Sequence, residues 1–284
     1  MGKGLRGTGK NMELPFVKLH GNGNDFILID EWNGIRVPDE MKGEFAAVYC
    51  DRKMGIGGDG VLFLGKTPEG GPAMRLFQPD ESEAEMCGNG IRCLIRYAFD
   101  MGYVTRQCTV KTVAGDIGAL CGYDDDGDFL VEVTMTEPKF DAASIPAKGS
   151  GDFHEIINGY EIYAANTGVP HAVVFVKDLE ILDICQIAPA IRNSTFFPSG
   201  ANVNFVEITG ENSIRIRTFE RGVEWETLSC GTGATASAAV AYHLGRTGPV
   251  VEVETEGGPL TINCTSGATM KGPADVVFTG ILIL

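Results

Sequence analysis

The chain has 284 residues, enough for two domains of ordinary size that each bury a core. Hydrophobic residues make up 44% and charged residues 21%, the balance of a globular protein, and no apolar run approaches the roughly 18 residues that span a membrane. The net charge of −15 argues against a nucleic-acid backbone as partner.

Residues 1–11 are basic and glycine-rich but lack the apolar segment of a secretory signal, so we expect a disordered extension. The eight cysteines include no Cys-x-x-Cys pair, which argues against a structural zinc site, so we expect no metal. A large chain without an export signal favours reduced thiols in a cytoplasm over a disulfide framework.

Short apolar or alternating runs, bounded by Gly, Pro, Asn and Asp, predict many strands. In the first half we expect strands at residues 16–19, 26–30, 60–64, 74–78, 109–113, 116–120 and 129–135. Between them, residues 87–103 carry apolar side chains at helical spacing, and Gly102 provides a C-terminal stop. The His20–Asn24 segment predicts a turn between the first two strands.

The second half repeats this order. We expect strands at residues 161–166, 172–177, 202–208, 213–219, 250–254, 260–264 and 275–284. The segment 233–244 is apolar on nearly every side, which predicts a buried helix that ends at Gly245. The repetition predicts an α+β fold of two pseudo-symmetric domains, each a strongly curved, mostly antiparallel sheet wrapped on a central helix.

Two matching four-residue motifs lie half a chain apart, each at the start of a predicted helix. They are Cys87-Gly88-Asn89-Gly90 and Cys230-Gly231-Thr232-Gly233. A helix N-terminus offers unpaired N–H groups and partial positive charge, which bind a carboxylate and favour thiolate over thiol. Two such termini in one cleft would hold a carboxylate with one sulfur on either side of the adjacent carbon.

That arrangement suits inversion of a stereocentre. One thiolate removes an α-proton, the opposite thiol returns a proton to the other face, and the helix ends stabilise the charge on the carboxylate. No pyridoxal phosphate or metal is needed, so we expect no cofactor. A second glycine-rich segment, residues 55–60, fits Gly-x-Gly-x-x-Gly, but a strand follows it where a dinucleotide site requires a helix.

At the level of motifs the chain strongly resembles the diaminopimelate epimerase family from residue 12 to 284. The matching segments are 20–26, 55–60, 86–93, 170–171, Asn202, 220–222 and 230–234. The resemblance implies a diaminopimelate epimerase-like fold, with one domain formed by residues 12–134 and 273–284 and the other by 135–272. It also implies cofactor-independent interconversion of LL- and meso-diaminopimelate in lysine biosynthesis, and a homodimer.

The resemblance further implies roles for individual residues. Cys87 and Cys230 match the two acid/base thiols, and His171 matches a residue that supports their ionisation together with Glu220. The other matched positions contact substrate: Gly88, Asn89, Gly231 and Thr232 at the reacting carboxylate, and Asn24, Asn202 and Arg221 at the distal end. Gln78 and Glu220 also fall at substrate-contacting positions.

The chain departs from the family pattern at several positions. Gln78 stands where Asn is usual, Val169 replaces an Asn, Gly60 occupies a position often filled by Gln, and Trp225 one that is commonly small or acidic. These departures leave open a racemase or epimerase of another amino acid. A non-catalytic binding relative and a Cys–His hydrolase are further alternatives, but a hydrolase needs only one of the two thiols.

Overall fold

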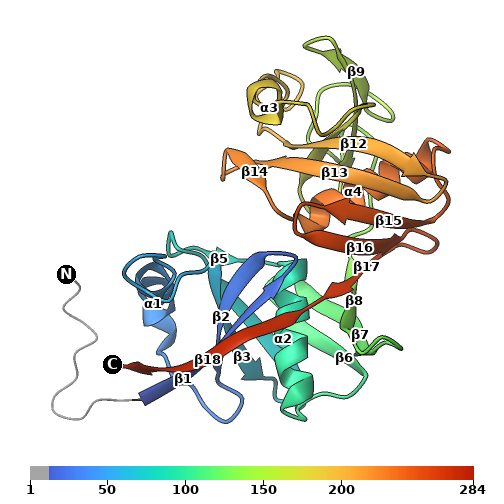
Figure 1. Cartoon of the computed structure of the whole chain (residues 1–284). Helices are drawn as coiled ribbons and strands as arrows, with labels where there is room; N and C mark the ends of the chain where they lie inside the picture. Colours follow the sequence, from blue (N-terminus) through green and yellow to red (C-terminus); the bar gives the residue numbers. More distant parts are fainter. Residues whose placement is uncertain (1–12) are drawn as a thin grey trace. The chain divides into compact units, whose positions relative to one another are not determined.

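A computed structural model describes residues 13–284, and the expected extension at residues 1–11 lies outside this range. The chain divides into two compact units, shown in Figure 1. Unit 1 runs to Val131 and also includes Pro273–Leu284, and unit 2 is Glu132–Gly272.

Both units consist mainly of strands. Unit 1 contains β1 (Glu13–Gly21), β2 (Asn24–Asp30), a 3-10 helix (Asp39–Met41), α1 (Lys42–Tyr49), β3 (Gly60–Lys66), β4 (Pro72–Phe77), β5 (Glu83–Ala84), α2 (Gly88–Asp100), β6 (Gln107–Thr112), β7 (Gly115–Tyr123), the start of β8 (Phe129–Met135) and β18 (Asp275–Ile283). Unit 2 contains β9 (His154–Ile157), β10 (Tyr160–Asn166), β11 (Pro170–Phe175), α3 (Ile184–Arg192), β12 (Asn202–Gly210), β13 (Ser213–Glu220), β14 (Trp225–Thr227), α4 (Gly231–His243), β15 (Val250–Thr255), β16 (Gly258–Asn263) and β17 (Ala268–Pro273).

The pairing of strands repeats from one unit to the other. In unit 1, β1–β2 is antiparallel, β2–β3 parallel, β3–β4 antiparallel and β4–β6 parallel. In unit 2 the same sequence of directions joins β10–β11, β11–β12, β12–β13 and β13–β15. The helices occupy matching places, because α1 and α3 each precede a parallel strand while α2 and α4 each follow a short edge strand. Each unit is therefore one copy of the same α+β arrangement, and the predicted fold class is confirmed.

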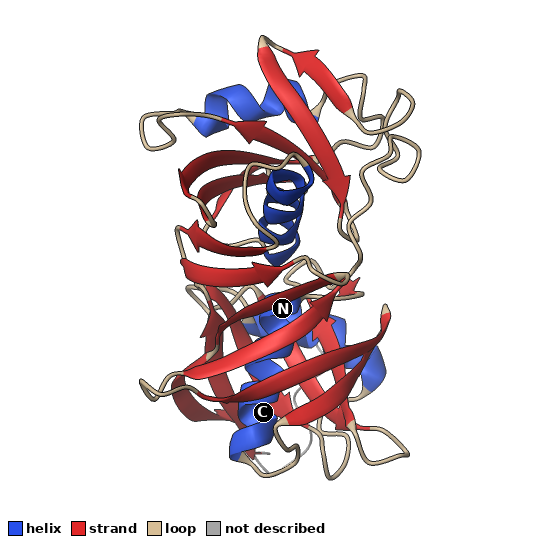
Figure 2. Cartoon of the chain, turned by 90° about the vertical axis from the view of Figure 1, so that its right-hand side faces the viewer, coloured by secondary structure: helices blue, strands red, loops and turns tan. Residues whose placement is uncertain are grey.

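The strands of each unit curve around its long helix, as Figure 2 shows for the helix of each unit. Helix α2 buries one face, including Ile91, Leu94 and Ile95, against the sheet of unit 1. Helix α4 is buried from Gly233 to Ala241 and is built mostly of alanine and other small residues. Small side chains let the surrounding backbone approach closely, so a helix without a polar face is stable inside the sheet.

The first hairpin depends on a tight turn. Asn22 and Gly23 both have positive φ, at 53° and 79°, between the ends of β1 and β2. Asn-Gly is the pair that two-residue hairpin turns of this kind favour. The turn sets the register in which Gly21 pairs with Asn24. It therefore fixes the position of Asn24 as the first residue of β2.

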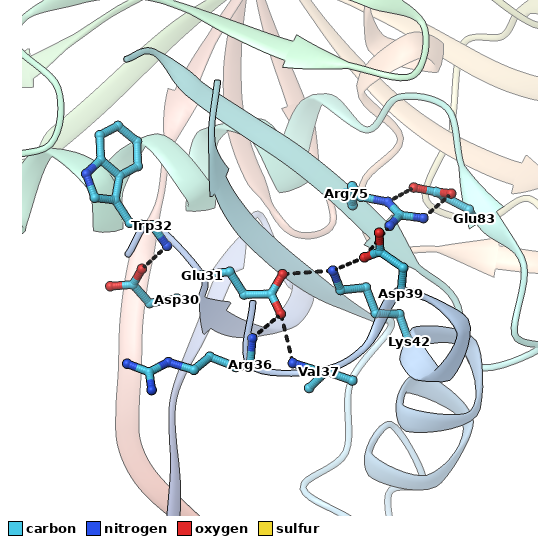
Figure 3. A network of polar contacts seen from close by, with 9 residues as sticks. All are labelled: Asp30, Glu31, Trp32, Arg36, Val37, Asp39, Lys42, Arg75 and Glu83. Atoms are coloured by element: carbon cyan, nitrogen blue, oxygen red, sulfur yellow. Dashed lines mark hydrogen bonds and ion pairs between the residues drawn. The ribbon is translucent and has the colours of Figure 1, made fainter. Parts of the chain in front are cut away.

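A network of ion pairs fastens α1 and the 3-10 helix to the sheet of unit 1 (Figure 3). Lys42 lies between Glu31, 2.8 Å away, and Asp39, 2.6 Å away, and the Lys42 and Glu31 side chains are both buried. Arg75 of β4 continues the network from Asp39 to Glu83 of β5. Because β5 immediately precedes Cys87, these contacts tie the approach to α2 into the rest of the unit.

The predicted strands all exist, with ends shifted by a few residues, and the two predicted helices are confirmed as α2 and α4. The sequence prediction missed α1, α3 and the 3-10 helix, together with the short strands β5, β9, β14 and β17. Within residues 13–284, the eight cysteines form no disulfide. Within residues 13–284, no helix is long and apolar enough to cross a membrane.

Candidate active site

Cys87 is the N-cap residue of α2. Its backbone is extended, with φ −148° and ψ 112°, and its Sγ accepts a hydrogen bond from the Gly90 N–H at 3.4 Å. The first N–H groups of a helix have no partner within the helix, so a side chain at this position satisfies them. A sulfur in this role lies in the positive end of the helix dipole, which favours its anionic form.

Two amides surround the Cys87 thiol. The Asn24 Oδ1 accepts from the Asn89 amide at 3.3 Å and lies 3.7 Å from the Cys87 Sγ. Asn89 is only 3% exposed, and its Oδ1 has no hydrogen-bond partner among the described residues. A buried acceptor without a partner costs free energy, so this atom is suited to receive a donor from a ligand.

Charged side chains behind Asn24 hold it in place. The Asn24 amide donates to the Asp59 Oδ2 at 2.7 Å, and Arg52 bridges Asp59 and Asp25 at 2.8 and 2.7 Å. Lys18 is buried and pairs with Asp25 at 2.6 Å. Burial raises the pKa of Asp25, but hydrogen bonds and charges from Arg52 and Lys18 outweigh it and set the pKa at about 2.

The sequence analysis assigned no role to Asp25, Asp59 or Arg52. Asp25 and Asp59 do lie in segments 20–26 and 55–60, two of the segments that match the family. They become neighbours because β2 and β3 pair in parallel, with Phe26 opposite Gly60. That pairing joins segments more than thirty residues apart, and it is not visible in local sequence patterns.

Cys230 is the N-cap residue of α4 and repeats the backbone geometry of Cys87. Its φ is −123° and its ψ is 106°, but its side chain makes no capping hydrogen bond. The Sγ lies 3.4 Å from the Thr232 hydroxyl instead, and the residue is 8% exposed. The Thr167 hydroxyl donates to the Thr232 carbonyl at 2.9 Å, which fixes the first turn of the helix against the end of β10.

A buried histidine stands behind Thr232. The His171 Nε2 is 3.0 Å from the Thr232 Oγ1, and its Nδ1 is 3.0 Å from the Asn204 amide nitrogen. The residue is fully buried, and burial together with the positive charge of Arg221 lowers its pKa to about 3. His171 is therefore a neutral ring at physiological pH.

The remaining predicted contacts of unit 2 gather at the ends of β12 and β13. Asn202 faces His171 across the parallel pair β11–β12, and its Oδ1 accepts from the Arg221 N–H at 2.7 Å. The Arg221 guanidinium donates to the Ser199 and Gly200 carbonyls at 2.9 and 3.2 Å. The Glu220 carboxylate accepts from the Thr227 hydroxyl at 3.0 Å.

Gln78 of unit 1 lies in an exposed turn after β4, where its amide oxygen accepts from the Ser82 hydroxyl at 3.1 Å. The structure thus brings Asn24, Cys87, Gly88 and Asn89 together in unit 1. In unit 2 it brings together His171, Asn202, Gly231, Thr232 and Cys230. Across residues 13–284, no three or more His, Cys, Asp or Glu side chains are grouped to hold a metal ion.

Comparison with solved structures defines the class of protein. The fold is similar to that of the PhzF-family phenazine biosynthesis protein of Bacillus anthracis, with a TM-score of 0.70 and 17% identity, covering 96% of this chain and 100% of that one. It is also similar to a predicted epimerase from Pseudomonas aeruginosa, with a TM-score of 0.66 and 14% identity over 95% and 99% of the two chains. The chain therefore has the α+β fold of the PhzF and racemase-like epimerases.

Sequence comparison narrows this class to one family. The family model for diaminopimelate epimerase matches residues 16–140 and 163–277. The diaminopimelate epimerase of Methanothrix thermoacetophila is 55% identical over 272 residues, which cover 95% of this chain and 96% of that protein. The chain belongs to the diaminopimelate epimerase family, and it is an isomerase.

Proposed function

We propose that this protein converts LL-2,6-diaminopimelate to the meso isomer in lysine biosynthesis, without a cofactor, using Cys87 and Cys230 as acid/base thiols. The observation that carries the proposal is the paired geometry. Each unit places a cysteine in extended conformation at the N-cap of its central helix, followed by Gly-x-Gly. Family membership supports the substrate, because the relatives that match over nearly the whole chain are named for this reaction.

In the proposed reaction one thiolate takes the α-proton, and the electron pair of the broken C–H bond moves toward the carboxylate. The opposite thiol donates its proton to the other face of the carbon, so the configuration inverts and the two sulfurs exchange protonation states. General acid–base catalysis of this kind contributes about 10²–10⁴-fold. The first-turn N–H groups of both helices are proposed to bind the reacting carboxylate.

The other predicted residues would orient the substrate. Gly88, Asn89, Gly231 and Thr232 form the helix starts, and Asn24, Gln78, Asn202, Glu220 and Arg221 would bind the rest of the molecule. His171 would support Cys230 through Thr232. The partnerless Asn89 Oδ1 is placed to accept a hydrogen bond from a substrate ammonium group.

Gly60 favours a second candidate, epimerisation of a different amino acid by the same chemistry. A Cβ at this position would lie 2.7 Å from the Leu76 Cδ1 and 3.0 Å from the Phe77 carbonyl oxygen. The glutamine often found at this position in the family therefore does not fit this backbone without a shift. The loss of one amide, together with Val169 in place of asparagine, would change the contacts to the distal end.

We also propose that residues 12–134 with 273–284 and residues 135–272 are the two epimerase domains, whose boundary lies close to that between the two units at Val131 and Glu132, and that the protein forms a homodimer through β18. This strand carries five exposed large apolar residues, Val276, Val277, Phe278, Ile281 and Ile283. Five exposed large apolar side chains on one strand suit a protein interface.

Sedimentation velocity tests the dimer. Ile281→Glu combined with Ile283→Glu should give a monomer, whereas Ile181→Glu, which changes an isoleucine 82% exposed in unit 2, should leave the dimer intact. A wild-type monomer at micromolar concentration would contradict the proposal. We propose the cytoplasm as the compartment, because catalysis by two thiols needs reducing conditions, and no nucleic acid as partner, because of the net charge of −15.

A stereoisomer-resolving assay tests the function. Reduced protein should convert LL-diaminopimelate to the meso isomer in the presence of EDTA and hydroxylamine, which remove metals and trap pyridoxal phosphate. Cys87→Ala and Cys230→Ala should each abolish conversion. Conversion of another amino acid from a panel, with none of diaminopimelate, would favour the second candidate. No conversion of any amino acid by folded, reduced protein would favour a binding relative.

A further inference from the structure

A chain of buried polar groups leads from the Cys230 sulfur into the core of unit 2. It passes from Cys230 to the Thr232 hydroxyl, to the His171 ring, to the Asn204 amide and to the Thr218 hydroxyl. The last three residues are at most 3% exposed. Sheet register produces the alignment, since Asn204 lies opposite Thr218 in β13 and two residues beyond Asn202, on the same face of β12.

The orientation of the Asn204 amide follows from its other neighbours. Its Nδ2 lies 3.3 Å from the Ala172 carbonyl oxygen, which can only accept a hydrogen bond. Its Oδ1 accepts from the Thr218 hydroxyl at 2.9 Å. The amide nitrogen therefore faces His171, and since an amide nitrogen only donates, the His171 Nδ1 must be the acceptor.

This contact selects a tautomer of His171. The buried ring is neutral and holds one proton, and with Nδ1 as acceptor that proton is on Nε2. The Asn202 amide nitrogen lies 3.4 Å from Nε2 and competes for the opposite tautomer. That tautomer would put two donors 3.0 Å apart at Asn204 and lose the shorter bond, so the Nε2–H form is favoured.

The consequence reaches the thiol. The Nε2–H donates to the Thr232 Oγ1 at 3.0 Å, which leaves the hydroxyl hydrogen of Thr232 available for the Cys230 Sγ, 3.4 Å away. A donor to sulfur stabilises the thiolate over the thiol. We call this path, from Asn204 through His171 and Thr232 to the Cys230 sulfur, the relay. Cys87 receives a hydrogen bond from the Gly90 N–H instead, so the relay is a feature of the surroundings of Cys230.

We propose that Asn204 is a positioning residue for Cys230, which holds His171 in the Nε2–H tautomer so that the Thr232 hydroxyl donates to the Cys230 sulfur. The inference rests on the proposed function for the role of Cys230 as an acid/base. The relay itself can be measured without substrate, so its failure and the failure of the epimerase assignment are distinguishable.

Nitrogen NMR of protein labelled with ¹⁵N-histidine tests the tautomer directly. The four histidines can be assigned with single His→Gln variants. We expect the His171 ring to show a protonated Nε2 and an unprotonated Nδ1 at neutral pH. A protonated Nδ1, in either the other tautomer or the imidazolium, would overturn the proposal.

Cysteine alkylation, followed for each peptide by mass spectrometry, tests the effect on sulfur. In Asn204→Leu and in Thr232→Val, the iodoacetamide rate of Cys230 at pH 7 should fall about tenfold, since a hydrogen bond to a charged group contributes about 1.5 kcal/mol. The pH midpoint of its alkylation should rise by about one unit. The rate of Cys87 in the same molecules should be unchanged.

Two further variants act as controls. Thr232→Ser keeps the hydroxyl and should restore the Cys230 rate. Thr235→Val removes a buried hydroxyl of α4 that donates to the Gly231 carbonyl outside the relay, and it should leave the rate unchanged. If folded Thr232→Val alkylates Cys230 at the wild-type rate, or if both cysteines slow equally, the relay does not exist. These results stand even if Asn204→Leu does not fold.

Discussion

The half-site around Cys87 in unit 1 and the half-site around Cys230 in unit 2 have the same backbone conformation at a helix N-cap. They differ in the side chains that surround the thiol. In unit 1, the thiol of Cys87 accepts a helix N–H and lies beside Asn24, which is held by an ion-paired cluster that includes the exposed Arg52 and Asp59. In unit 2, the Cys230 sulfur lies beside the Thr232 hydroxyl, which contacts the buried, neutral His171 ring. The surroundings of Cys87 are thus built from the helix backbone and an amide held by ion pairs, and those of Cys230 from a hydroxyl and a histidine.

The difference shows how a duplicated fold can adapt two equivalent positions separately. Exposed ion pairs are screened by salt and cost little to rearrange, whereas a buried polar chain must be fully satisfied. We therefore expect the unit 1 half-site to respond to ionic strength, and the unit 2 half-site to respond to changes in packing. The predictions below test that contrast, from the largest expected effect to the smallest.

Replacing either thiol should have the largest effect. Cys87→Ser and Cys230→Ser should each lower kcat by about 10²–10⁴-fold, because a hydroxyl is a far weaker acid/base than a thiol at neutral pH. Steady-state rates of stereoisomer conversion measure the change. A variant that kept most of its activity would show that only one half-site supplies an acid/base group.

The glycines three residues after each thiol should respond unequally to alanine. At Gly233, a Cβ would lie 2.4 Å from the Asn204 Oδ1, whereas at Gly90 the nearest atom is the Leu62 Cδ2 at 3.3 Å. Overpacking costs about 1–3 kcal/mol of folding free energy, so urea unfolding of Gly233→Ala should show a loss of stability in this range. In Gly90→Ala the gain in helix propensity, about 1 kcal/mol, offsets part of the strain. Equal losses in the two variants would contradict the difference in packing.

Asp59→Asn should lower kcat/KM about tenfold, because it weakens the charge-assisted hydrogen bond that places the Asn24 amide beside Cys87. The loss should be smaller at high salt, where the wild-type ion pairs with Arg52 are already screened. Kinetics at two ionic strengths measure it. Asp116→Asn, an exposed change elsewhere in unit 1, serves as control and should behave as wild type.

Acid should destabilise the protein through His171. Its pKa is about 3 when folded and near 6.5 when unfolded, so between these values the unfolded chain binds more protons. The free energy of unfolding should fall as the pH drops below about 6.5, by up to ~1.4 kcal/mol per pH unit. Urea unfolding at a series of pH values measures this free energy. Its slope against pH should be shallower in His171→Gln than in wild type. His154→Gln, an exposed histidine paired with Glu161, should keep the wild-type slope.

Local sequence patterns predicted the strands and both helix starts well, because alternation and helical spacing report directly on buried faces. Helix α3 escaped prediction although Ile184, Ile187, Ala188 and Ile191 have helical spacing, since Pro189 interrupts it. Helix α1 is short, and its first residue, Lys42, is a buried cation that pairs with Asp39 and, further away in the sequence, with Glu31. Such long-range partners are absent from local patterns.

The same limit applies to the site. The repeated Cys-Gly-x-Gly motif identified Cys87 and Cys230 from the sequence. No such motif marks the residues that surround them. Asp59 and Asn204 reach the half-sites through strand pairing, β2 with β3 and β11 with β12. A second Asn two residues after Asn202 was visible as a same-face position on a strand, which is the one signal that could have identified Asn204.

Hydrogen exchange at the α-carbon tests the two-thiol epimerase most directly. LL-diaminopimelate is incubated with reduced protein in deuterated water and followed by NMR, without added pyridoxal phosphate or metal. We predict growth of the meso isomer with deuterium at one α-carbon, abolished in both Cys87→Ala and Cys230→Ala. Folded, reduced wild-type protein that exchanges no α-hydrogen, or undiminished formation of deuterated meso isomer in either variant, would contradict the account.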